Sequence, residues 1–194
     1  STQSQLLKVA LEERGQEVLL TREPGGTNLG KVLRGILLDP ETGSLAPRAE
    51  ALLYAADRAH HVETVIKPAL AKQTVVITDR YIDSSVAYQG GGRVLSGQEI
   101  ARISRWATDG LTPTLTILLD LPAQIGFGRF AERDRLESEP LDFHERVRST
   151  FLERAALYSD RYLVVDATQS KEDISAQILE RVLRLNSISR LKDK

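Results

Sequence analysis

Short, wholly apolar runs alternate along the chain with longer segments whose apolar residues recur at the spacing of an amphipathic helix. Continuous apolar runs of strand length are typical of strands that are buried on both faces of a parallel sheet. This alternation of strand and helix predicts an α/β fold. The predicted strands are residues 18–21, 75–78, 115–120 and 162–166.

Helical periodicity predicts helices before, between and after these strands. They are residues 1–14, 29–38, 47–70, 96–109, 123–132, 142–159 and 171–186. Gly15 is a suitable stop for the first helix, and Ser170 is a suitable N-cap for the last one. Residues 90–93 and 133–141 lack periodicity and are expected to be loops. The end of the chain, residues 187–194, is expected to be a frayed tail.

Length and composition narrow the classes of function. The 194 residues suffice for one α/β domain, so a single domain spanning 1–194 is expected. Lys and Arg number 26 against 27 for Asp and Glu, which predicts no basic surface for a nucleic acid polymer. The chain has no cysteine, which excludes disulfides and thiolate metal sites. No apolar stretch approaches the roughly 20 residues of a membrane span and no signal peptide is visible, so a cytoplasmic protein without membrane attachment is expected.

The strongest chemical signal follows the apolar run at 75–78, where Asp79, Arg80 and Tyr81 stand at the end of a predicted strand. Open α/β sheets bind ligands at the carboxyl ends of their strands. A guanidinium group matches phosphate oxygens and stays charged at any working pH, so Arg80 is predicted to hold a phosphate. The alternative is a surface ion pair, which is the commoner fate of an arginine.

Further motifs surround this one. Thr-Arg-Glu-Pro-Gly-Gly-Thr occupies 21–27, after the first apolar run, and Asp-Arg-Leu-Glu occupies 134–137 in an arginine-rich stretch. Gly25 and Gly26 are expected to serve the backbone shape of their loop. Together these motifs predict a nucleotide kinase.

The segments TREPGGT, LLYAADR, DRYIDSSxAYQGGG and DRLE occur in an order and spacing that resemble bacterial thymidylate kinases, over essentially the whole chain. The resemblance implies a three-layer P-loop NTPase-like fold, with a central parallel sheet flanked by helices. It implies transfer of the γ-phosphoryl group of ATP to dTMP, giving dTDP, with Mg²⁺ bridging the donor phosphates. It also implies a homodimer that pairs through long helices such as 47–70.

On the acceptor side, the resemblance implies that Arg34 and Arg80 together hold the monophosphate of dTMP. Glu23 and Pro24 belong to the same loop. Because a solvated arginine on a helix is common, the role of Arg34 comes from the resemblance alone. A kinase of this type depends on positioning and charge neutralisation, and the attacking phosphate oxygen is already anionic, so no general base is expected.

For the base and sugar, Tyr54 and Arg58 stand four residues apart and share one helical face. The resemblance implies that Tyr54 stacks on thymine and that Arg58 bonds a carbonyl of the base. Ser85 and Gln89 would complete recognition of the base, and Tyr88 would lie beneath the sugar, where it excludes a ribose hydroxyl. Without the resemblance, aromatic residues at these positions would be read as core.

A lid around 129–141 is implied over the transferring phosphoryl group. Arg133 is the first candidate for its catalytic arginine and Arg129 the second, and both Arg133 and Arg135 would contact ATP. Glu137 resembles a lid carboxylate that approaches the nucleotide. Asp134 belongs to the same lid, with local capping or pairing as its alternative role.

The metal and donor site is expected to involve Asp79, Ser1 and Thr2. Asp79 resembles the carboxylate that organises Mg²⁺. In a G-x-x-x-x-G-K-[ST] loop the last hydroxyl ligates the metal at a helix start, and Ser1 would supply it, with Thr2 beside it. The chain has no methionine, including an initiator, so we expect residues to precede Ser1. The resemblance implies that they hold the first strand, which lies in the middle of the sheet, and this glycine-rich loop. Without that strand, a central gap in the sheet is expected.

Three histidines, His60, His61 and His144, complete the candidate chemistry. Adjacent histidines on a helix point to different sides, so a zinc site is not expected and a surface or interface position is. Two rival functions stay open: another P-loop nucleoside or nucleotide kinase, and a non-catalytic nucleotide-binding protein if the phosphate loop is absent. Paired Arg34 and Arg80 oppose a nucleoside substrate, which has no phosphate to hold.

Overall fold

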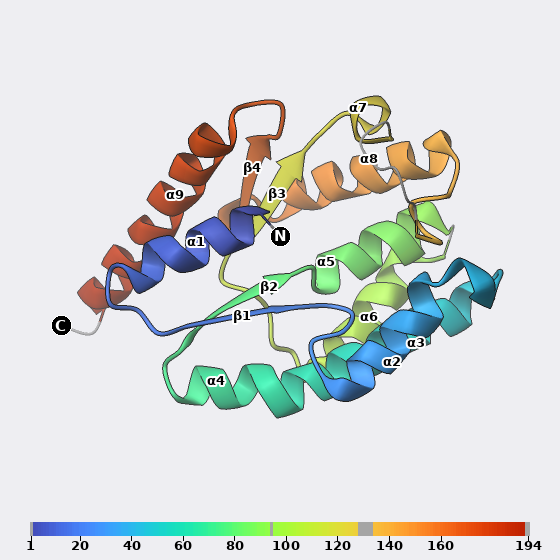
Figure 1. Ribbon diagram of the computed structural model, residues 1–194, viewed down its shortest axis with the longest axis horizontal. Helices are drawn as coiled ribbons and strands as arrows, with labels where there is room; N and C mark the ends of the chain where they lie inside the picture. Colours follow the sequence, from blue (N-terminus) through green and yellow to red (C-terminus); the bar gives the residue numbers. More distant parts are fainter. Residues whose placement is uncertain (1, 94, 128–133, 193–194) are drawn as a thin grey trace.

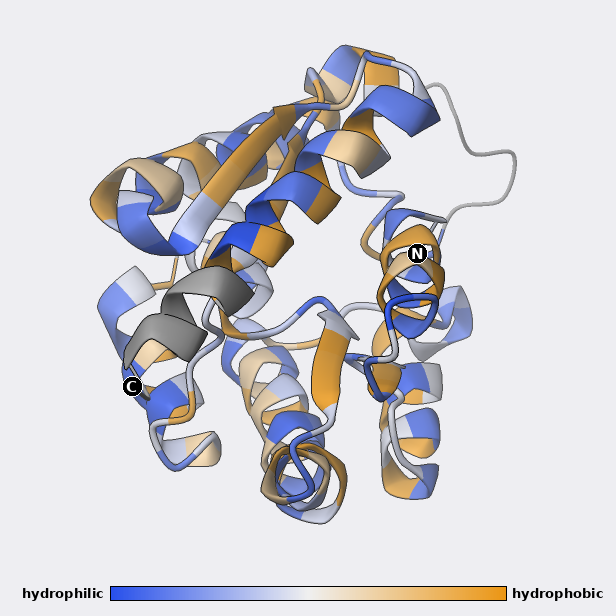
Figure 2. Ribbon diagram, turned by 90° about the vertical axis from the view of Figure 1, so that its left-hand side faces the viewer, coloured by the Kyte–Doolittle hydropathy of each residue, from blue (hydrophilic) through white to orange (hydrophobic). Residues whose placement is uncertain are grey.

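The computed structural model describes residues 2–93, 95–127 and 134–192 (Figure 1). Every predicted strand is present within a residue or so of its expected bounds. The strands consist mainly of hydrophobic residues, whereas the helices carry both hydrophobic and hydrophilic residues (Figure 2). The strands are β1 (Val18–Arg22), β2 (Val75–Asp79), β3 (Thr116–Asp120) and β4 (Tyr162–Asp166).

The helices follow the predicted periodicity, and some of them begin at residues with polar caps. The side chain of Thr27 accepts a hydrogen bond from the Gly30 amide, and that of Ser170 accepts one from Asp173. The helices are α1 (Thr2–Glu12), α2 (Asn28–Leu38), α3 (Pro47–His61), α4 (Lys67–Ala71), α5 (Ile82–Ser85), α6 (Gly97–Ala107), α7 (Ala123–Phe127), α8 (Leu141–Leu157) and α9 (Lys171–Lys192). Single 3₁₀ turns lie at η1 (Pro40–Thr42) and η4 (Ser159–Arg161).

Two wider, π-helical segments were not predicted. One, η2 (Val62–Ile66), joins α3 to α4 within the single helix expected at 47–70. Pro68 follows it and has no amide hydrogen to donate to a regular helical bond, which accounts for the irregularity. The other, η3 (Val86–Gly92), replaces the loop expected at 90–93.

Close packing explains why η3 is glycine-rich. A Cβ atom on Gly91 would lie 2.1 Å from Oγ1 of Thr150, and one on Gly92 would lie 2.5 Å from a ring carbon of Phe143. The backbone of η3 therefore lies directly against α8, which only glycine permits. The prediction of a loop was wrong because glycines carry no hydrophobic periodicity. The prediction of a frayed tail was wrong as well for residues 187–192, which belong to α9, since no proline or glycine interrupts that helix. Residues 193–194 lie outside the described part of the chain.

The strands form two parallel pairs. In one, β1 pairs with β2 from Val18 opposite Val75 to Arg22 opposite Asp79, and in the other β3 pairs with β4. Within the described residues these pairs are separate two-stranded sheets. The parallel pairs with covering helices confirm the α/β class.

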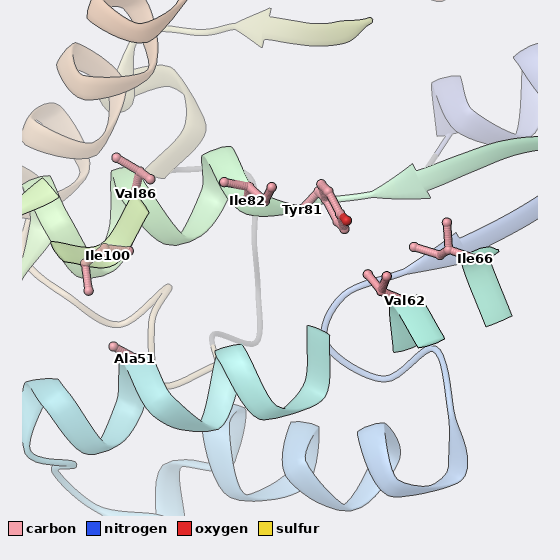
Figure 3. Packing of buried hydrophobic residues seen from close by; sticks show 7 residues of the cluster. All are labelled: Ala51, Val62, Ile66, Tyr81, Ile82, Val86 and Ile100. Carbon is pink, nitrogen blue, oxygen red and sulfur yellow. The ribbon is translucent and has the colours of Figure 1, made fainter. Parts of the chain in front are cut away.

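Helices α1 and α9 cover the strands and join the two pairs through a common core (Figure 1). Its most buried members are Leu11 on α1, Val165 on β4 and Ile178 on α9. A second core lies around α3, α5 and α6, where side chains of these helices meet those of η2, η3 and Tyr81 (Figure 3). Both cores are formed by the apolar faces that the sequence pattern predicts.

Register decides where the site forms. Because the β1–β2 ladder ends with Arg22 opposite Asp79, the residues that follow both strands leave the sheet at the same edge. The Glu23 amide extends the ladder by donating to the carbonyl of Asp79 at 3.0 Å. Every helix in residues 2–93, 95–127 and 134–192 is too short or too polar to cross a membrane.

Replacing Leu11 with Ala should lower the free energy of unfolding by about 2–5 kcal/mol, because Leu11 is 1% exposed and its loss leaves a cavity between α1 and the strands. Urea denaturation followed by circular dichroism measures this change. Leu6→Ala, on the same helix but 39% exposed, is the matched control and should cost much less. Equal effects of both variants would contradict the assignment of Leu11 to the core.

Candidate active site

A cavity of about 130 Å³ lies where the carboxyl ends of β1 and β2 meet α2, α3, α5 and η3. Its walls contain most of the side chains that the sequence motifs single out. The predicted residues that line it are Glu23, Pro24, Arg34, Tyr54, Arg58, Arg80, Ser85, Tyr88, Gln89, Asp134 and Glu137. Four further lining residues, Leu38, Ser84, Leu136 and His144, were not predicted.

Two guanidinium groups enter the cavity from different elements. Arg34 lies on α2 and donates from Nη1 to the carbonyl of Pro24 at 3.2 Å. Arg80 follows β2 with a φ of 70°, and the hydroxyl of Thr78 donates to its carbonyl at 2.9 Å. Among the described residues, neither guanidinium forms a salt bridge with a carboxylate. The cavity therefore holds two cationic groups that are available to an anion.

Arg80 is held in place by an aromatic ring. Its guanidinium carbon lies 5.0 Å from the ring centroid of Tyr88, within the range of a cation–π interaction. The interaction with Tyr88 is also the largest influence on the pKa of Arg80, which is raised. Tyr88 in turn packs against Phe143 and Phe151, with ring centroids 6.2 Å and 6.3 Å away. Arg80 is therefore a positioned and permanently charged group.

The loop at 23–27 approaches Arg34 closely. The Glu23–Pro24 peptide bond is cis, and Gly25 has a φ of 110°, a conformation that favours glycine. A Cβ atom on Gly25 would lie 3.1 Å from Cδ of Arg34. The Gly25 amide donates to Oδ1 of Asp57 at 3.3 Å, which anchors the loop on α3. At Gly25, glycine is therefore required both by the positive φ and by the close approach of Arg34.

A buried carboxylate anchors the same loop. Glu23, which is 3% exposed, accepts a hydrogen bond from Nε of Arg58 at 2.7 Å and lies 2.9 Å from Nδ1 of His61. Nη2 of Arg58 donates to the hydroxyl of Ser85 at 3.1 Å and to the carbonyl of Tyr81 at 3.2 Å. The guanidinium of Arg58 is therefore fixed in orientation beside the cavity.

The expectation for His61 was wrong. Its side chain is fully buried, with Nε2 2.7 Å from Oγ1 of Thr21 and Nδ1 facing Glu23, rather than lying at a surface or interface. Which of two adjacent histidines faces inward depends on the rotation of α3, which their adjacency does not reveal. His60 is exposed, as expected, whereas His144 lies in the cavity wall.

In the cavity wall, Tyr54 is 8% exposed, and burial raises the pKa of its hydroxyl. Gln89 is 1% exposed and donates from Nε2 to Oε1 of Glu50 at 3.0 Å. Tyr54 and Arg58 both line the cavity, as their shared helical face predicts. The buried partner of Gln89, Glu50, was not predicted, because an acidic residue on an amphipathic helix gives no signal of burial.

The described part of the predicted lid contains Asp134, Arg135 and Glu137. Oδ1 of Asp134 accepts hydrogen bonds from the amides of Leu136 at 2.9 Å and Glu137 at 2.8 Å. Asp134 therefore caps the backbone locally, which is the alternative role expected for it. Arg135 does not line the cavity. Its guanidinium donates to the carbonyl of Leu37 at 2.8 Å and pairs with Glu50. The expected contact between Arg135 and ATP stays a prediction.

The remaining predicted residues lie outside this cavity. Asp79 ends β2, and Thr2 is the exposed first residue of α1. Ser1, Arg129 and Arg133 lie outside the described residues. Within the described residues, no cluster of three or more His, Asp or Glu side chains could hold a metal ion.

A family model described as thymidylate kinase matches residues 1–178. A protein named thymidylate kinase from Clavibacter sepedonicus is 58% identical over 185 residues, which cover 93% of this chain and 87% of that protein. One from Cutibacterium acnes is 47% identical over 185 residues, covering 95% and 91%, and one from Bifidobacterium longum is 50% identical over 182 residues, covering 92% and 88%.

The buried Asp57 predicts a pH-dependent stability. Burial raises the pKa of Asp57, and Oδ2 has no hydrogen-bond partner among the described residues. The folded protein therefore binds this proton more tightly than the unfolded chain, and stability falls as pH rises above the usual carboxyl value of 3.8. Urea denaturation between about pH 3 and pH 7 should show Asp57→Asn gaining free energy of unfolding relative to the wild type as pH rises.

Asp83 supplies the matched control with the opposite sign. Burial raises its pKa, but hydrogen bonds and charge from Arg161 and Arg154 outweigh this, so the pKa is lowered. Its stabilising contribution is present at neutral pH and lost as pH falls through the folded pKa. Asp83→Asn should therefore lose stability relative to the wild type as pH rises. The same trend in both variants would contradict the assignment for Asp57.

Proposed function

The chain belongs to the thymidylate kinase family, and from this premise we propose that it phosphorylates dTMP to dTDP in the cavity lined by Arg34 and Arg80. ATP is the phosphoryl donor that the family implies. The observation that carries the proposal is the meeting of two guanidinium groups, neither in a salt bridge within the described residues, at the end of β2. A nucleoside monophosphate carries up to two negative charges on its phosphate, which two such groups can neutralise.

The chemistry asked of these residues is positioning and charge neutralisation. Phosphoryl transfer from ATP needs little covalent help from the protein, and an acceptor phosphate oxygen near neutral pH is already ionised. Arg34 and Arg80 would hold that oxygen in line with the donor. Arg133, or in second place Arg129, would neutralise charge on the transferring group. The chain therefore needs no general base.

Selection of the nucleoside is assigned to the other walls of the cavity. Tyr54 would stack on thymine, while Arg58 and Gln89 would form hydrogen bonds with the base, helped by Ser85. The fixed orientation of Arg58, held by Glu23, supports this role because a bonding partner that does not rotate discriminates better. Tyr88, held between Arg80 and two phenylalanines, would occupy the space of a ribose 2′-hydroxyl.

Magnesium would be held by few protein oxygens. Mg²⁺ in kinases is typically bound by one or two carboxylates together with substrate phosphates, so the lack of an acidic cluster among the described residues fits this donor set. Asp79 at the end of β2, with Ser1 and the neighbouring Thr2, would hold it and contact the donor. When bound, the ion would supply charge neutralisation on the phosphates. The proposed location is the cytoplasm, where nucleotide substrates are found.

A second copy of the chain is the proposed partner. Between α3 and α6 lies a cavity of about 950 Å³ whose wall includes Leu52 and Trp106, which are 57% and 83% exposed. Large exposed apolar side chains beside a hollow mark interaction sites, and tryptophan is enriched at the centres of interfaces. The expected homodimer through the helix at 47–70 would use this surface.

The test of the function is a coupled assay of ADP release with dTMP, dUMP, UMP, CMP and thymidine as acceptors. We expect dTMP to have the highest kcat/KM and thymidine to give no product. Arg80→Met should lower kcat/KM for dTMP on the order of 100-fold, since it removes a charged donor from the phosphate. Arg184→Met, on the exposed surface of α9, is the control and should leave it unchanged.

Two outcomes would count against this assignment. Phosphorylation of thymidine as efficient as that of dTMP would mean that the cavity does not need an acceptor phosphate. Full activity in Arg80→Met would mean that the phosphate lies elsewhere.

The dimer is tested by Trp106→Glu. A charge at the centre of an apolar interface should shift the protein from dimer to monomer, which size-exclusion chromatography with light scattering measures. Leu157→Glu, at a position 72% exposed on α8, adds the same charge elsewhere and should leave the dimer intact. A monomeric wild-type protein, or dimers in both variants, would contradict the proposed interface.

A further inference from the structure

Glu50 on α3 is fully buried, yet it carries no direct role in the site described above. Its Oε1 accepts hydrogen bonds from Nε2 of Gln89 at 3.0 Å and from Nε of Arg93 at 3.3 Å. Its Oε2 accepts from Nη2 of Arg93 at 3.3 Å and pairs with Nη2 of Arg135. Both oxygens of one buried carboxyl group are therefore occupied by donors from three side chains.

These donors keep Glu50 ionised. Burial alone raises the pKa of Glu50, but the hydrogen bonds from Gln89, Arg93 and Arg135 outweigh burial, and the pKa is lowered. An ionised carboxylate has lone pairs and no hydrogen, so it can only accept hydrogen bonds. Whatever atom of Gln89 faces Glu50 must consequently be a donor.

That requirement fixes the amide of Gln89. A glutamine side chain ends in an NH₂ donor and a carbonyl acceptor, and its two flipped forms are otherwise nearly equivalent in shape. Glu50 holds the NH₂ end. The carbonyl oxygen is then the end left for the cavity, which Gln89 lines together with Tyr54 and Arg58.

An acceptor in this place suits one class of base. Thymine and uracil carry a hydrogen on N3, which can donate to a carbonyl oxygen, whereas N3 of cytosine is an acceptor and would face the same oxygen without a hydrogen between them. A site built around a hydrogen bond discriminates strongly against a base that leaves its polar group unpaired. We propose that Glu50 is a positioning residue that holds the Gln89 carbonyl toward the base and so makes the site selective for pyrimidines with a hydrogen on N3. This inference rests on the proposed dTMP site.

The same carboxylate reaches the flank of the predicted lid. Arg135, which Glu50 pairs with, lies between Asp134 and Glu137 in the cavity wall, and Arg93 also pairs with Glu139. The buried carboxylate of Glu50 therefore links segment 134–139 to the side-chain amide of Gln89. Substitution of Glu50 would be expected to alter both, so the test must separate selectivity for the base from a general loss of order.

Glu50→Gln is the sharpest variant. The carbonyl oxygen of the new side chain would take the place of Oε2 and accept from Nη2 of Arg93 and Nη2 of Arg135. Its NH₂ would take the place of Oε1 and face Gln89, with loss of the hydrogen bond from Nε of Arg93. Gln89 would then turn its own carbonyl toward residue 50 and its NH₂ toward the base. Calorimetric titration of the full chain with dTMP, dUMP and dCMP should show dTMP and dUMP weakened in parallel by about tenfold or more, with dCMP unchanged or tighter.

The control is Asp83→Asn, which removes another buried carboxylate paired with two arginines, Arg154 and Arg161, without touching Gln89. It should preserve the dTMP-to-dCMP affinity ratio even where it lowers stability. An unchanged ratio in Glu50→Gln, or the same change in both variants, would overturn the proposal. Binding alone is measured, so the donor site does not enter the result.

If Glu50→Gln does not fold, the orientation of the Gln89 amide can be tested on the wild-type protein. In ¹⁵N-resolved NMR, the side-chain NH₂ protons of Gln89 should be slow to exchange and should keep their shifts when dTMP binds. Contacts between those protons and the base would overturn the proposal. Failure of the proposed function has a different signature, which is a wild-type protein that binds dCMP as tightly as dTMP.

Discussion

The buried ion pair between Glu23 and Arg58 is the interaction on which the site depends. Through it, the loop after β1 is joined to α3, and the same guanidinium reaches the carbonyl of Tyr81, which follows β2, and the hydroxyls of Ser85 and Ser104. Removing one partner of a buried pair is costly, about 3–5 kcal/mol, because the other charge is left uncompensated. The cavity walls are consequently held in one arrangement before any substrate binds.

Buried charge in this chain follows a consistent pattern. Glu23, Glu50 and Asp83 each lie in the interior and each accepts hydrogen bonds from at least one arginine. Such pairing offsets the desolvation of both groups, and the geometry of the planar guanidinium fixes the angle between the elements it joins. The three clusters connect elements that are far apart in the sequence, and the first of them lines the cavity through Glu23 and Arg58.

Two of the residues with a positive φ lie close to the same place. Arg80 adopts a left-handed φ of 70° and Gly25 a φ of 110°, on the two loops that leave β1 and β2 side by side. A left-handed conformation in a residue other than glycine is unfavourable by roughly 1–2 kcal/mol. Here it directs the guanidinium of Arg80 over Tyr88, and the buried network around Arg58 holds the surrounding chain.

The sequence by itself determined the strands, most helices, the α/β class and most of the residues that line the cavity, because apolar periodicity and short motifs are local properties. The tertiary structure alone decided how charged residues pair. Arg135 turns to Glu50 rather than to the cavity, His61 is buried beside Glu23, and η3 replaces a glycine-rich loop because it packs on α8. These outcomes depend on which distant side chain arrives within hydrogen-bonding distance, and no local pattern in the sequence encodes that distance.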